Sequence, residues 1–320
     1  MSAALHEEPF DALRTLLRSF GQIVLQRNAA TGACVLAAWL VSDARLACAA
    51  SDGCDRGERR RRVRAATIPP NTRDGLHGFN GALAGLVAST FIADDATAMA
   101  VAILAATAAA WLLGPWARLL HSRGLGFYSS PCLLVTWAWL PLVYLAPAHV
   151  AASDAASWFY PMRGLLAGVA QTSFAGSALA GVLILGGIAL SSMRSALFVL
   201  AGAALATSAH WLIGADSASL GAGLLGFNGA LTALALADCG VLAALAGVGV
   251  SVAMQQAAIV SGLPAMTAPF VVATWTLRLL MRDTRRTSTS NRSRAPDSAI
   301  ERSADLGRRE KTTRAVSPEG

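Results

Sequence analysis

The sequence predicts an all-α polytopic membrane protein that consists of two copies of one unit. Of its 320 residues, 54% are hydrophobic and only 14% are charged, and the mean hydropathy is +0.50, unlike a soluble domain. Several nearly charge-free stretches have 18 or more residues, enough to cross a bilayer as helices: 96–116, 132–152, 163–190, 195–214 and 239–262. Residues 223–231, Gly-Leu-Leu-Gly-Phe-Asn-Gly-Ala-Leu, match residues 75–83 at eight of nine positions.

Two further markers recur in the same order and extend this repeat. A Gln stands ten residues before a Gly in each copy, at Gln22 and Gly32 and again at Gln171 and Gly181. A hydroxyl residue stands two residues before a Pro at 129–131 (Ser, Pro) and at 267–269 (Thr, Pro). The markers predict a first membrane repeat over 1–150 and a second over 151–281. Repeats of this kind commonly hold a site at mid-membrane between the two copies.

One charged segment breaks the symmetry. Residues 52–64, within an atypical stretch over 52–74, carry nine charges in thirteen residues, six of them Arg, whereas their counterparts 200–212 are apolar. Each Arg costs roughly 2.5–3.5 kcal/mol at the bilayer centre, so the segment cannot cross. It is either a genuine basic loop or an out-of-frame stretch of a GC-rich gene. We prefer the second hypothesis, which an apolar span in an alternative reading frame would support.

The two ends differ from the membrane part. Residues 8–20 are predicted to form an amphipathic lead-in, and the acidic start argues against a cleavable signal peptide. The tail, 282–320, has ten Lys/Arg against six Asp/Glu and few large apolar residues, which predicts a disordered, cytoplasmic segment. No aromatic residues interleave its charge, so nucleic acid is not expected as a partner. Five cysteines without CxxC spacing predict neither disulfides nor a metal site.

The polar residues of the membrane part favour a passive path for a neutral solute. Its acidic residues flank the apolar runs instead of lying within them, and coupling to protons or sodium generally needs an intramembrane carboxylate. The remaining polar groups are amides and hydroxyls: Gln22, Gln171, Thr172, Ser129, Thr267, Asn80 and Asn228. Singly, each is best explained by an interhelical hydrogen bond, and only their paired recurrence favours function. No nucleophile–base pair or metal-ligand spacing is visible, so neither an enzyme nor a cofactor is expected.

With these motifs, residues 15–281 resemble the urea transporter family. The resemblance rests on Gly-Gln-x-x-[Leu/Phe] followed by Gly, on the doubled Gly-Phe-Asn-Gly-Ala-Leu, and on Leu-Pro-x-x-Thr-x-Pro-Phe at 263–270. It implies two inverted repeats, each of about five spans plus a re-entrant half-helix, with a pore between them and three protomers in a trimer. It also implies channel-like, facilitated diffusion of urea through a multi-pass protein of the inner cell membrane.

The resemblance also implies which residues contact urea. The first slot would consist of Phe79 and Leu83, with Leu25 where the family usually has Phe. The second would consist of Phe227, Leu231, Phe174 and Thr172. Gln22 and Gln171 would lie near the slots, and Ser129 and Thr267 would supply hydroxyls at the narrow centre. Departures from the family pattern are Leu25, the missing Leu-Pro before Ser129, and the charged segment 52–64.

Two alternatives to a urea channel remain open at this stage. One is a related channel for a small neutral amide or for water, which liposome flux measurements distinguish. The other is a membrane protein that transports nothing, either an inactivated homologue or a partner-binding scaffold. The charged segment 52–64 is the feature that favours this second alternative.

Overall fold

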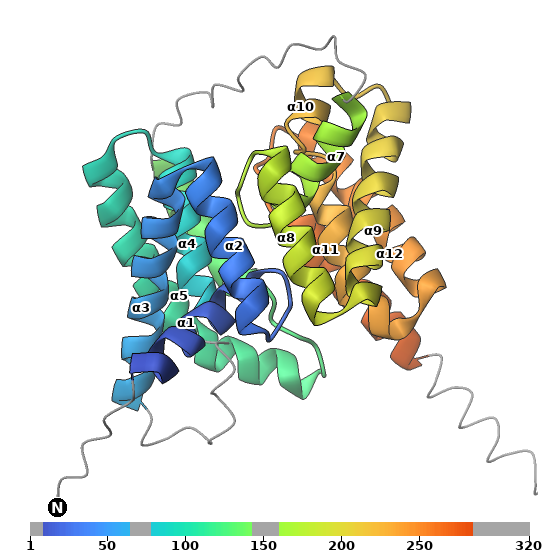
Figure 1. Cartoon of the computed structure of the whole chain (residues 1–320). Helices are drawn as coiled ribbons and strands as arrows, with labels where there is room; N and C mark the ends of the chain where they lie inside the picture. The colour runs from blue at the N-terminus through green and yellow to red at the C-terminus, as the bar shows by residue number, and fades with distance from the viewer. Residues whose placement is uncertain (1–8, 65–77, 143–159, 284–320) are drawn as a thin grey trace, which may run out of the picture. The chain divides into compact units, whose positions relative to one another are not determined.

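The computed structural model describes residues 9–64, 78–142 and 160–283, and the regular structure in these ranges is helical, as predicted (Figure 1). In the first half, the described residues form six α-helices and a short 3-10 helix: α1 (Pro9–Ile23), α2 (Ala29–Ser42), α3 (Ala44–Arg64), α4 (Phe79–Phe91), α5 (Asp95–Ser122), α6 (Ser130–Trp139) and η2 (Leu140–Leu142).

The described residues of the second half contain α7 (Tyr160–Gln171), α8 (Ala178–Ser191), α9 (Met193–Leu212), α10 (Ser217–Gly221), α11 (Phe227–Ala235), η3 (Ala237–Cys239), α12 (Val241–Val260) and a last helix at 268–283. Contacts divide the chain into one compact unit over Met1–Trp275 and another over Thr276–Gly320. Of the second unit, the described residues 276–283 are helical. The remainder of the predicted tail lies outside the described residues.

Each half surrounds one central helix that begins with the Gly-Phe-Asn motif. Helix α4 packs against α3 and α5, and its residues 79–88 are all buried. Helix α11 packs against α9 and α12 and is buried from Asn228 to Ala235. Helices α2 and α8 pack against each other and join the two halves. The repeated motif therefore starts the most buried helix of each half.

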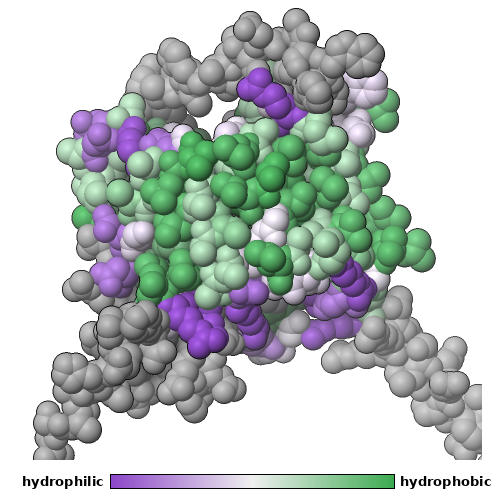
Figure 2. Space-filling model, in the orientation of Figure 1, coloured by the Kyte–Doolittle hydropathy of each residue, from purple (hydrophilic) through white to green (hydrophobic). Residues whose placement is uncertain are grey.

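Three described helices are long and apolar enough to cross a membrane: α5, α9 and α12. They coincide with the predicted stretches 96–116, 195–214 and 239–262. Many of their large apolar side chains are exposed, among them Leu104 on α5, Leu205 on α9 and Leu242 on α12. Figure 2 shows one face on which hydrophobic surface forms a broad band, with hydrophilic residues gathered along two opposite borders. This distribution is that of a membrane protein.

Two predicted stretches differ from the structure. Residues 163–190 do not form one span, because α7 ends at Gln171 and α8 begins only at Ala178. Phe174 between them has a φ of 63°, which a helix cannot contain, and the side chain of Ser177 caps the start of α8. In the stretch 132–152, helix α6 ends at Trp139 and η2 at Leu142, and the residues from 143 lie outside the described ranges. The predicted amphipathic lead-in corresponds to α1.

The charged segment 52–64 is helical instead of irregular, and its helix is not among the described helices that are apolar enough to cross a membrane. Helix α3 runs without a break from Ala44 to Arg64. A Cβ atom at Gly53 would collide with the carbonyl oxygen of Gly81 on α4, and one at Gly202 would collide with that of Gly229 on α11. The same close approach of two glycines thus occurs at equivalent places in the two halves. The out-of-frame hypothesis for the charged segment stays a prediction, which the coding DNA tests.

Close helix packing makes a prediction about the two glycines of α8. A Cβ at Gly181 would collide with the carbonyl oxygen of Leu166 on α7, whereas a Cβ at Gly186 would meet nothing within 4 Å. Overpacking of this kind costs about 1–3 kcal/mol. We expect Gly181→Ala to lower the melting temperature of the protein in detergent. Gly186→Ala, the control on the same helix, should leave it unchanged or raise it, because Ala favours a helix. Equal melting temperatures for the two variants would contradict the packing.

Candidate functional site

The hydroxyl markers of both halves lie in a turn that begins a helix. The residue before each hydroxyl has a left-handed backbone, with φ of 46° at Tyr128 and 47° at Met266. Positive φ is uncommon for residues other than Gly, so its occurrence at equivalent positions marks the same turn. Helix α6 begins directly after Ser129, and the last helix begins directly after Thr267.

The Asn of each Gly-Phe-Asn motif holds this turn in place. Asn80 Nδ2 donates to the carbonyl oxygen of Tyr128 at 3.2 Å, and Asn80 Oδ1 accepts from the backbone N–H of Cys132 at 3.2 Å. The amide of Asn80 thus pairs with the carbonyl of Tyr128 and with the N–H of Cys132. This N–H is among the first of α6, which have no acceptor within their own helix. The turn is therefore anchored to the buried helix α4.

Asn228 makes the same two bonds in the second half. Its Nδ2 donates to the carbonyl oxygen of Met266 at 3.0 Å, and its Oδ1 accepts from the N–H of Phe270 at 3.2 Å. The interhelical hydrogen bonds proposed for both Asn residues are thus confirmed. Asn228 has one more partner, because its Nδ2 also donates to Gln255 Oε1 on α12 at 3.1 Å.

The two turns meet at their hydroxyls. Ser129 Oγ and Thr267 Oγ1 lie 2.8 Å apart, and both residues are buried, at 7% and 8% exposure. Since one hydroxyl donates to the other, nothing passes between them. The pair keeps one free O–H and three lone pairs between its two oxygens. It forms a small polar surface that accepts more hydrogen bonds than it donates.

The Gln markers lie where α1 and α7 end. In each half a left-handed residue follows, with φ of 55° at Leu25 and 63° at Phe174. The backbone bonds agree as well: Leu25 N–H donates to Gln22 O at 3.0 Å, and Phe174 N–H donates to Gln171 O at 3.1 Å. The chain then starts α2 or α8. The two predicted slot residues Leu25 and Phe174 therefore stand at equivalent positions of equivalent turns.

Two polar side chains at the Gln171 turn already donate hydrogen bonds to backbone carbonyls. Gln171 Nε2 donates to Ala222 O at 3.2 Å, and Thr172 Oγ1 donates to Val169 O at 2.6 Å. A hydroxyl that has given its proton to a carbonyl presents only lone pairs, so Thr172 is an acceptor for any further partner. Gln22 is buried at the end of α1, at 5% exposure.

The predicted aromatic and aliphatic walls fall into two apolar clusters. Phe79 and Leu83 are buried in the larger cluster, where Phe79 stacks on Phe127 with ring centroids 5.9 Å apart, and Phe174 packs against this cluster. Leu231 belongs to a smaller cluster, against which Phe227 packs. Leu25 packs against both clusters. The division of these side chains into two separate slots stays a prediction.

Four residues near the site escaped the sequence analysis, and all four use a side-chain N–H. Gln255 Nε2 donates to Leu224 O at 2.9 Å and supports Asn228. Trp39 Nε1 donates to Ser173 O at 2.8 Å, next to Phe174. Trp137 and Trp275 each reach the turn of the other half. An amide within the apolar stretch 239–262 was a signal for Gln255, whereas the tryptophans looked like ordinary apolar residues.

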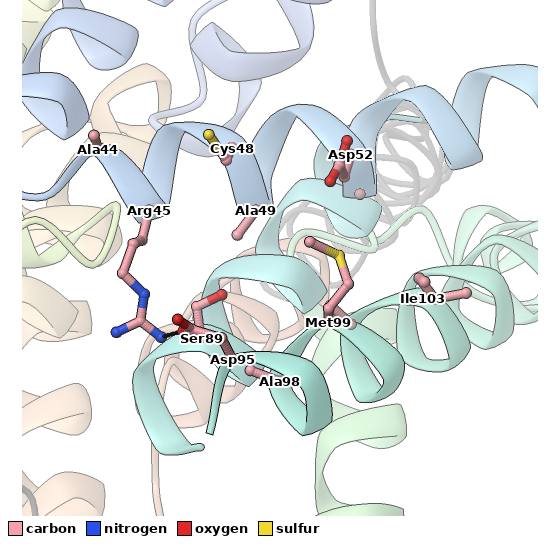
Figure 3. A pocket seen from close by; sticks show the side chains of 12 residues that line it. Ala44, Arg45, Cys48, Ala49, Asp52, Ser89, Asp95, Ala98, Met99 and Ile103 are labelled. Atoms are coloured by element: carbon pink, nitrogen blue, oxygen red, sulfur yellow. Dashed lines mark ion pairs between the residues drawn. The ribbon is translucent and has the colours of Figure 1, made fainter. Parts of the chain in front are cut away.

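Two open cavities are lined by none of the predicted urea-contacting residues. A cavity of about 310 Å³ between α3, α4 and α5 contains an ion pair of Arg45 with Asp95 and is lined by none of the predicted site residues (Figure 3). A second, of about 400 Å³, is lined by Asp216 and Gln255 among others. The N–H of Ser219 donates to Asp216, which lowers the pKa of this carboxyl below its usual value.

Across the described residues, no group of three or more His, Cys, Asp or Glu could hold a metal ion.

Comparisons with known proteins identify the family. No individual curated protein matched the sequence. A family model described as urea transporter matches residues 13–283, which is most of the chain and includes both turns, both Gly-Phe-Asn motifs and both Gln markers. Members of this family carry urea across a membrane, which agrees with the apolar helices and with the predicted resemblance. The chain belongs to the urea transporter family.

Proposed function

We propose that this protein is a passive channel for urea, with its path beside the Ser129–Thr267 pair, between two inverted repeats. The observation that carries the proposal is the contact of these two hydroxyls, 2.8 Å apart and buried where the two equivalent turns meet. A buried polar pair offers hydrogen bonds that can replace those of water for a solute that passes it.

The chemistry of the pair suits urea. Urea is flat and neutral, and it has four N–H donors for one carbonyl acceptor. The Ser129–Thr267 pair and the lone pairs of Thr172 Oγ1 offer an excess of acceptors, which can replace water for the urea N–H groups. Apolar side chains such as Phe79 and Leu231 would admit a flat molecule. None of the described residues that we assign to the path is a carboxylate that could hold a cation or carry a proton.

The repeated geometry supports the inverted repeats. Left-handed residues recur at Leu25 and Phe174 and at Tyr128 and Met266. The Asn80 and Asn228 bonds recur as well. By family analogy we infer a homotrimer in the inner cell membrane, with a separate path in each protomer.

An inactivated homologue is the second candidate. The observation in its favour is α3, which is as long as α9 but is not among the helices apolar enough to cross a membrane. A channel for another small amide or for water would use the same hydroxyls. Flux measurements on the whole protein distinguish these candidates.

Urea flux into proteoliposomes tests the function. We expect fast, downhill urea entry that neither a proton gradient nor a sodium gradient alters, because no carboxylate couples the solute to an ion. Thr267→Val keeps the shape but removes an acceptor, at a cost of about 1–3 kcal/mol for an unpaired urea N–H. The flux should then fall about tenfold or more.

Thr274→Val is the matched control. Thr274 lies on the last helix, 268–283, and is fully buried. Its hydroxyl has no hydrogen-bond partner within the described residues. It should keep the parental flux. Urea that accumulates against its gradient would overturn the passive mechanism, and a parent without urea flux would favour the inactivated homologue.

The two left-handed slot residues give a second test, of selectivity. If both line the path, Phe174 should make a tighter contact with a flat solute than Leu25, because an aromatic face stacks on a planar group. Phe174→Leu should raise the ratio of dimethylurea to urea permeability, and Leu25→Phe should lower it. The ratio is measured by stopped-flow light scattering at matched protein incorporation. Parental ratios in both variants would exclude both side chains from the path.

A further inference from the structure

Two tryptophans connect the turns of the two halves in a reciprocal way. Trp137 Nε1 on α6 donates to Pro264 O at 3.0 Å, and Trp275 Nε1 on the last helix donates to Gly126 O at 2.7 Å. Each indole therefore reaches from one half to the turn of the other.

The two bonds are equivalent in register as well as in chemistry. Trp137 follows Ser129 by eight residues, and Trp275 follows Thr267 by eight. The acceptor carbonyls each stand three residues before the hydroxyl of their own turn. If each residue is replaced by its counterpart in the other half, the Trp137 bond becomes the Trp275 bond, and the Ser129–Thr267 contact is unchanged. The hydroxyl contact is therefore central, and the tryptophan bonds flank it.

An indole bond of this kind is a stiff connection. The indole offers a single N–H donor on a rigid ring with two rotatable bonds, and Trp275 is also packed against the apolar cluster of Leu231 and Phe270. The acceptors belong to non-helical backbone, where a carbonyl needs a partner from outside its own segment. Three contacts, two indole bonds and one hydroxyl bond, consequently fix the distance between the turns.

We propose that Trp137 and Trp275 are positioning residues that set the width of the solute path at the Ser129–Thr267 pair, and through it the preference for small flat solutes. The proposal rests on the proposed function. The two tryptophans would affect selectivity without touching the solute. Trp137 holds the turn that carries Thr267, and Trp275 holds the turn that carries Ser129. The competing role is anchoring at the membrane surface, since Trp137 is 42% exposed.

Two substitutions at each position separate these roles. Trp→Phe keeps an aromatic ring and loses the donor, whereas Trp→Tyr keeps a donor on a ring. We expect Trp137→Phe and Trp275→Phe each to raise the ratio of dimethylurea to urea permeability by about two- to tenfold, which corresponds to the loss of one hydrogen bond. The Tyr variants should stay closer to the parental ratio. Trp211→Phe, at a tryptophan that is 65% exposed, is the control and should leave the ratio unchanged.

A second measurement does not depend on urea transport. The hydroxyl oxygens of Ser129 and Thr267 are 2.8 Å apart, so Ser129→Cys with Thr267→Cys should form a disulfide under mild oxidation. The rate of this reaction reports the distance between the turns. It should fall at least severalfold when Trp137→Phe or Trp275→Phe is added, and it should stay constant with Trp211→Phe.

The outcomes are distinguishable. A parent without urea flux would overturn the proposed function. The cross-linking rate would still test whether the two tryptophan bonds set the distance between the turns. An unchanged permeability ratio in the Phe variants overturns the proposal, and so does an equal fall of both permeabilities together with a lower melting temperature, which indicates a purely structural role. Failure of the parental cysteine pair to cross-link also overturns it, because the turns would then not meet.

Discussion

The structure depends on the need to satisfy non-helical backbone in an apolar environment. A turn inside such a protein exposes carbonyl and N–H groups that have no water to bind, and each unpaired group costs several kcal/mol. Asn80 and Asn228 meet this need with one amide each, which donates to the turn and accepts from the helix after it. A carboxylate could only accept and an amine could only donate, so a carboxamide is the side chain that suits both bonds.

Once the turns are held, the other features follow from them. The fixed backbone places Ser129 and Thr267 in contact, and the helices that leave the turns carry Trp137 and Trp275 toward the opposite turn. The two halves are thus joined in the centre by polar bonds. Elsewhere they are joined by close helix packing between α2 and α8, where Thr31 Oγ1 donates to Gly187 O at 2.7 Å. The hydrogen bonds in the centre are directional, so they fix how the two turns are oriented. Apolar packing alone would not fix this orientation.

The sequence predicted the family, the helical class and the two Asn anchors, because these depend on motifs that recur at a fixed offset. It did not predict the left-handed backbone at Phe174 within the apolar stretch 163–190, since a positive φ leaves no trace in hydropathy. It also missed the bonds of Trp137 and Trp275, because an indole in an apolar run resembles any other large side chain. Their carbonyl acceptors are backbone atoms, which no side-chain pattern reports.

The first part of α3 supports α4 by the same kind of close packing. Helix α3 approaches the buried helix α4 closely at Gly53, and Leu46 and Ala50 before this glycine are buried. Asp52 and Asp55 in this region are exposed, so they cost the contact with α4 nothing. The close approach of α3 to α4, the helix that carries Asn80, therefore buries no charge at Asp52 or Asp55. The same approach recurs between Gly202 and Gly229, so both halves share this packing despite the charged composition of α3.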